Sequence, residues 1–145
     1  MLLNDDKYYF DLAIREARKA LNTNNVPVGC VIVFKNKIIA KAYNKKNNKN
    51  ISIYHAEILA IIKACKYLKT FILEECTMYV TLEPCMMWMG AIIESRIKKV
   101  YFGAKNNSEQ MYDFDKISKY VDIYNLNDSE SSKILSDFFK NKRKN

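Results

Sequence analysis

The chain has 145 residues, of which 24 are lysine or arginine and 16 are aspartate or glutamate, giving a formal net charge of +8. This length suits a single domain over residues 1–145, and the presence of only three glycines and two prolines excludes a repeat-rich or linker-rich design. The acidic N-terminus is unlike a signal peptide and no apolar run reaches membrane-spanning length, so we expect a cytoplasmic protein without a membrane partner.

The first half of the chain predicts a helix followed by a hairpin. Apolar residues recur at helical spacing over residues 5–22, with acidic residues at the end where the helix dipole favours negative charge. A stretch rich in β-branched residues at 26–34 predicts a buried strand, and 38–43 predicts the strand that returns from a tight turn. The polar loop at 44–52 then leads into a predicted helix at 55–68.

The second half alternates between the two kinds of element. Strands are predicted at 77–82 and 98–104, with a helix at 86–95 between them. Residues 105–120 are polar and irregular with room for a short helix, 121–126 can form a last strand, and 129–144 reads as a helix capped by Ser129. This alternation predicts an α/β fold, in which a mixed sheet carries helices on both faces.

The candidate catalytic and metal-binding residues lie at the starts of two predicted helices. His55 is the single histidine of the chain, and a lone histidine is more often structural than a ligand. Here it opens a helix together with Ala56 and Glu57, and Cys85 opens another helix after Pro84. Helices that begin at the carboxyl ends of neighbouring strands direct their N-termini at a shared crevice, where the helix dipoles favour a thiolate or a hydroxide.

The order H-x-E followed by P-C-x-x-C is the signature of zinc nucleobase deaminases. In such a site imidazole and thiolate ligands hold Zn²⁺ and leave one position for a water, while a carboxylate that is not a ligand moves protons. His55 and Cys85 match ligand positions and Glu57 matches the proton carrier, but Trp88 stands where the second cysteine is expected. The indole has no lone pair to offer a metal, so Trp88 does not replace the missing thiolate.

Long stretches in the matching order resemble the bacterial tRNA adenosine deaminases of the cytidine and deoxycytidylate deaminase superfamily, namely VPVGCVIV, HAEILAI, TMYVTLEPC, MGAIIESRI, VYFGA and LSDFFKNKRK. The resemblance implies a three-layer α/β/α cytidine-deaminase-like fold with a mixed five-stranded sheet. It also implies a homodimer that uses Zn²⁺ as cofactor and the tRNA anticodon loop as partner. The implied reaction is hydrolytic deamination of adenosine to inosine at the wobble position.

Carried over by position, the resemblance implies that His55 and Cys85 bind zinc and that Glu57 shuttles protons. It implies that Asn44 hydrogen-bonds the purine. The rest of the implied pocket comes from Val26, Pro27 and Leu82 as walls, and from the backbone N–H of Ala56, which would face the leaving side of the ring.

Trp88 leaves alternatives open. Cys65 and Cys76 are too distant along the chain to complete the metal site, and only Cys30 stays in consideration as a substitute ligand. The chain is then either an active deaminase with an unusual metal site, a catalytically inactive RNA-binding or partner subunit, or a deaminase of guanine or a cytosine nucleotide. The glycine-free stretch KNNSEQMYDF at 105–114 also departs from the family, which puts anticodon recognition in question.

Overall fold

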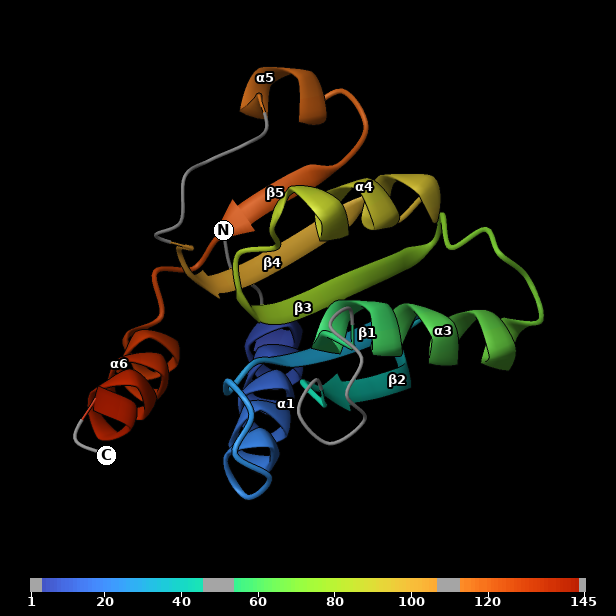
Figure 1. The fold of residues 1–145 in the computed structure, drawn as a ribbon. Helices are drawn as coiled ribbons and strands as arrows, with labels where there is room; N and C mark the ends of the chain where they lie inside the picture. Colours follow the sequence, from blue (N-terminus) through green and yellow to red (C-terminus); the bar gives the residue numbers. More distant parts are fainter. Residues whose placement is uncertain (1–3, 46–53, 107–112, 144–145) are drawn as a thin grey trace.

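The computed structural model describes residues 4–45, 54–106 and 113–143. Within them the elements follow in the order α1 (Asn4–Leu21), β1 (Gly29–Phe34), β2 (Lys37–Tyr43), α3 (Ala56–Leu68), β3 (Cys76–Leu82), α4 (Met86–Glu94), β4 (Lys99–Ala104), α5 (Phe114–Ile117), β5 (Asp122–Asn125) and α6 (Ser129–Arg143). Figure 1 shows these elements around one central sheet. Most predicted elements are confirmed to within a few residues, including the short helix and the last strand.

The sheet has five strands in the order β2-β1-β3-β4-β5. β1 pairs antiparallel with both β2 and β3, whereas β3, β4 and β5 run parallel. The predicted mixed five-stranded sheet is therefore confirmed. The parallel strands need crossover connections, which α4 supplies between β3 and β4 and the segment containing α5 supplies between β4 and β5.

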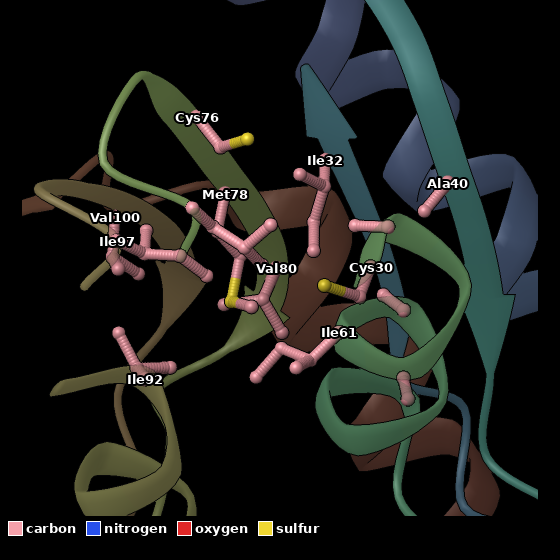
Figure 2. Packing of buried hydrophobic residues seen from close by; sticks show 14 of the residues in the cluster. Cys30, Ile32, Ala40, Ile61, Cys76, Met78, Val80, Ile92, Ile97 and Val100 are labelled. Carbon is pink, nitrogen blue, oxygen red and sulfur yellow. The ribbon is translucent and has the colours of Figure 1, made fainter. Parts of the chain in front are cut away.

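Side-chain alternation along the strands divides the core into two layers. In β1, Cys30 and Ile32 belong to the cluster that also contains residues of α3 and α4, whereas Val31 and Val33 belong to the cluster formed with α1 and Ile134 of α6. Successive strand residues point to opposite faces of a sheet, so a fully apolar strand such as β1 must be covered on both sides. Figure 2 shows part of the α3 and α4 side of this core. Helices on both faces confirm the three-layer α/β/α arrangement.

Glycine is needed where α1 crosses the start of β1. A Cβ atom at Gly29 would overlap the backbone carbonyl oxygen of Ala13 and the backbone nitrogen of Ala17. Immediately before it, the N–H of Val28 donates to the carbonyl oxygen of Val26 at 2.8 Å, which forms a tight turn. This turn explains why β1 begins at Gly29 and not at position 26, where the β-branched pattern starts.

The cap of α6 differs from the prediction. Asp128, and not Ser129, caps this helix, because its Oδ2 accepts hydrogen bonds from the backbone N–H and the hydroxyl of Ser131, each at 2.8 Å. The polar loop predicted at 44–52 and the glycine-free stretch at 105–114 lie largely outside the described residues. In the part of the chain that the structure describes, no helix is both long enough and apolar enough to cross a membrane.

Candidate active site

The candidate site lies at the end of the sheet where β2 and β3 finish and β1 begins. Gly29 at the start of β1 pairs with Tyr43 at the end of β2, and Cys30 pairs with Val80 near the end of β3. The sequence-based expectation of neighbouring strands is wrong in this detail, because β1 lies between the two and runs antiparallel to both. The carboxyl ends of β2 and β3 nevertheless reach the same end of the sheet, so α3 and α4 begin close together there.

His55 and Cys85 are the N-cap residues of α3 and α4. Both have extended backbone conformations, with φ of −79° for His55 and −73° for Cys85, and neither side chain bonds to the first turn of its own helix. Each side chain thus stands at the positive end of a helix dipole, which attracts negative charge.

Most of the predicted site residues meet at one cavity of about 210 Å³, which is lined by Asn25, Val26, Val28, Asn44, His55, Glu57, Leu82, Glu83, Cys85, Trp88 and Asn106. This volume is below the range for drug-sized ligands and suits a single base. The residues come from five separate stretches of sequence, and together they bring an imidazole, a carboxylate and a sulfur to one cavity.

Glu57 is the buried acid of this cavity. Its side chain is only 4% exposed, and its Oε1 has no hydrogen-bond partner among the residues that the structure describes. Burial raises the pKa of the Glu57 carboxyl from its ordinary value of 4.5 to about 7, against a smaller opposing effect of a hydrogen bond from the Glu57 backbone N–H. Near neutral pH this carboxyl therefore exists in both protonation states, as a group that takes up and returns protons requires.

Asn44 joins the two sides of the cavity mouth. Its Oδ1 accepts a hydrogen bond from the backbone N–H of Ala56 at 2.8 Å, and its Nδ2 donates to the carbonyl oxygen of Val26 at 3.1 Å. This arrangement corrects the expectation for Ala56, whose buried N–H is directed at Asn44 and not at a substrate ring. Nδ2 carries a second proton, through which Asn44 can still bond a purine.

The predicted walls are only partly as expected. Val26 and Leu82 line the cavity, whereas Pro27 is buried and does not border it. The sequence reasoning missed Glu83, although it directly precedes the Pro84-Cys85 pair. Glu83 is buried, and its Oε1 accepts a hydrogen bond from the backbone N–H of Asn106 at 3.1 Å, which fastens the segment after β4 to the cavity rim.

The residues present do not fit a zinc centre with three protein ligands. Trp88 occupies the position of the third ligand, with its ring centroid 5.1 Å from that of His55. Cys30 does not substitute, because it lies in the apolar core beside α3 (Figure 2) and is not among the residues that line the cavity. Among the described residues, no group of three or more histidine, cysteine, aspartate or glutamate side chains is arranged to hold a metal ion.

Comparison with known proteins agrees with the fold and the cavity. Residues 4–143 match the MafB19-like deaminase family. A tRNA-specific adenosine deaminase of Buchnera aphidicola is 40% identical over 150 residues, covering 99% of each chain. A solved structure from a study of A-to-I editing by tRNA:A34 deaminases at the wobble position has a TM-score of 0.82 and 36% identity, covering 89% of this chain and 99% of that one.

A guanine deaminase from Bacillus subtilis is also similar, with a TM-score of 0.67 and 31% identity, covering 94% of this chain and 93% of that one. Both its TM-score and its sequence identity to this chain are lower than those of the tRNA:A34 deaminase structure. The chain therefore belongs to the MafB19-like deaminase family and to the family of the tRNA-specific adenosine deaminases.

Proposed function

We propose that the chain converts adenosine at the wobble position of a tRNA anticodon loop to inosine, in the cytoplasm. One observation carries the proposal. A base-sized cavity holds Glu57 beside His55 and Cys85 in a chain that is 40% identical, over nearly its whole length, to a tRNA-specific adenosine deaminase. A base inside a folded anticodon loop reaches such a cavity only when it is splayed out of the stack, which suits an unpaired wobble base.

The reaction adds water to C6 of the purine and releases the amino group as ammonia. Glu57 takes the proton of the attacking water and delivers protons to the ring nitrogen and then to the departing amino group. Asn44 orients the base through its second amide proton, and Val26 and Leu82 pack against the ring. We assign no step to Zn²⁺, because the side chains present supply only two of the three protein ligands that the family relationship implies.

The same family relationship supports a homodimer. Met86 and Met87 in the first turn of α4 are 50% and 51% exposed, next to the buried Trp88 and Met89. Two exposed methionines beside a buried apolar stretch form a surface that a second copy of the chain can cover. Light scattering should give a dimer mass, and replacing both exposed methionines with lysine should shift that mass toward the monomer.

Activity on four separate substrates distinguishes this function from the alternatives. The chain, supplied with zinc, would be incubated in turn with an anticodon stem-loop carrying a wobble adenosine, with the same loop carrying adenosine one position away, with guanine and with a cytosine nucleotide. We expect inosine only from the first substrate and none from a Glu57→Gln variant. Ammonia release from guanine in place of inosine formation would support a small-molecule deaminase, and tight stem-loop binding by a chain that makes no inosine would support a non-catalytic subunit.

A further inference from the structure

The first turn of α4 carries the feature that sets this chain apart from the deaminase signature. Cys85 is the N-cap of α4 and Trp88 lies three residues further on, so both side chains leave the helix on the same side. In the signature, both positions are cysteines that hold one metal ion. Here the second position is occupied by Trp88, the single tryptophan of the chain. Its side chain faces the same cavity as Cys85.

Trp88 is held in place against the first ligand position. Its side chain is 3% exposed and its ring lies across that of His55 at an interplanar angle of 44°. The indole ring has thus not turned away to the protein surface. It fills space that a thiolate and a metal ion would share in a three-ligand site.

Two buried polar atoms for which the described residues provide no hydrogen bond belong to residues that line this cavity. Trp88 Nε1 and Glu57 Oε1 are the buried side-chain nitrogen and oxygen atoms for which the described residues provide no hydrogen bond. Native proteins rarely leave such atoms unpaired, and an orphan of this kind costs stability. Glu57 and Trp88 both line the cavity that also holds His55 and Cys85, the two residues that match ligand positions of the zinc deaminase signature.

No other described side chain restores the lost ligand. Cys30 is fully buried in the core between β1 and α3, and among the described residues no three histidine, cysteine, aspartate or glutamate side chains are grouped so that they could hold a metal ion. Glu57 itself is the proton carrier of the proposed reaction, so recruiting it as a ligand would remove that role.

We propose that Trp88 reduces the zinc centre to the two ligands His55 and Cys85, so that this chain holds zinc weakly. The proposal rests on the proposed deaminase function. Replacing an outer-sphere partner already weakens zinc binding about 10-fold to 100-fold, so the loss of a direct ligand should weaken it by at least about 100-fold. Trp88→Cys should recover that factor.

Zinc affinity provides a readout that does not depend on activity. Competition with a chromophoric chelator would be measured for the chain as written, for Trp88→Cys and for Trp88→Phe, which keeps the aromatic bulk but offers no sulfur. We expect tight binding of one zinc ion per chain only in Trp88→Cys. Trp88→His, which supplies an imidazole and leaves a smaller cavity, serves as a second ligand-bearing variant if the cysteine variant does not fold.

The two proposals fail in different ways. If the chain as written or Trp88→Phe binds zinc as tightly as Trp88→Cys, the inference about Trp88 is wrong, whatever the chain does to RNA. If neither ligand-bearing variant gains affinity while remaining folded, the inference is wrong as well. If Trp88→Cys binds zinc tightly but forms no inosine in a wobble-adenosine stem-loop, the inference about the metal stands and the proposed function is wrong.

Discussion

Replacing Glu57 with glutamine is expected to remove a pH dependence from the stability of the fold. In the folded chain the pKa of the Glu57 carboxyl is about 7, compared with 4.5 when the side chain is exposed to water. Between these two values the folded state binds more protons than the unfolded state, so the free energy of unfolding falls as the pH rises. Below about pH 4.5 the Glu57 carboxyl is protonated in both the folded and the unfolded state, so its burial as a carboxylate costs no stability. Above about pH 7 the full penalty for burying the carboxylate applies.

The size of this penalty follows from the shift in pKa. One pKa unit corresponds to 1.36 kcal/mol, so Glu57 lowers the free energy of unfolding by about 3 kcal/mol at pH 8 and by less than about 1 kcal/mol at pH 5. Glutamine has nearly the same shape and does not ionise. Glu57→Gln should therefore be more stable than the parent chain at pH 8, by an amount that shrinks toward pH 5.

Urea unfolding followed by circular dichroism at both pH values measures this difference, with a chelator present so that the two metal-free chains are compared. Glu94 on α4 is exposed to solvent, so Glu94→Gln makes the same chemical change without removing a buried group. That control should follow the parent chain at both pH values. A Glu57→Gln variant that gains no stability over the parent between pH 5 and pH 8 would show that the carboxyl does not titrate in the buried cavity described above.

Three further results are expected. Gly29→Ala should lower the free energy of unfolding by about 3 kcal/mol in urea unfolding, because the added Cβ meets the backbone of α1. Gly90→Ala places its Cβ in open space on a helix and should raise the free energy of unfolding by about 0.5–1 kcal/mol. Similar effects in both variants would contradict the close approach of α1 to Gly29. Iodoacetamide at about pH 8 should modify Cys85 well before Cys30, since Cys30 is fully buried and burial raises the pKa of its thiol; peptide mapping by mass spectrometry that finds equal rates would refute this. Asn44→Ala should destabilise the fold by about 1–3 kcal/mol in urea unfolding and Asn44→Asp by less, because aspartate still accepts from the buried N–H of α3; equal losses would contradict that bond.

The sequence predicts most of the fold because local patterns and packing agree. The β-branched run around Val31 must be buried on both faces of the sheet, and the predicted helices on either side of it in the sequence supply that cover. The differences occur where a side chain or a turn decides the boundary. Val26 is as strand-like as Val31, but the hydrogen bond from Val28 to its carbonyl oxygen folds it out of the strand and onto the cavity wall.

The site is less predictable because its details depend on contacts between distant segments. Spacing alone places His55 and Cys85 at helix starts, but it does not reveal that an antiparallel strand separates the two strands before them. It also does not show that Asn44 already engages the backbone of Ala56, or that Cys30 faces the core. Trp88 is the strongest example, since the sequence already shows that this side chain is not a metal ligand, yet only the structure shows that its ring lies against His55.

Deamination in oxygen-18-labelled water tests the central claim most directly. A stem-loop with a wobble adenosine would be incubated with zinc and either the chain as written or Trp88→Cys, and the digested nucleosides analysed by mass spectrometry. The account predicts inosine at the wobble position with one heavy oxygen atom, formed faster by Trp88→Cys and not at all once Glu57→Gln is added. An unchanged wobble adenosine with every one of these proteins, or inosine whose formation does not depend on Glu57, would contradict it.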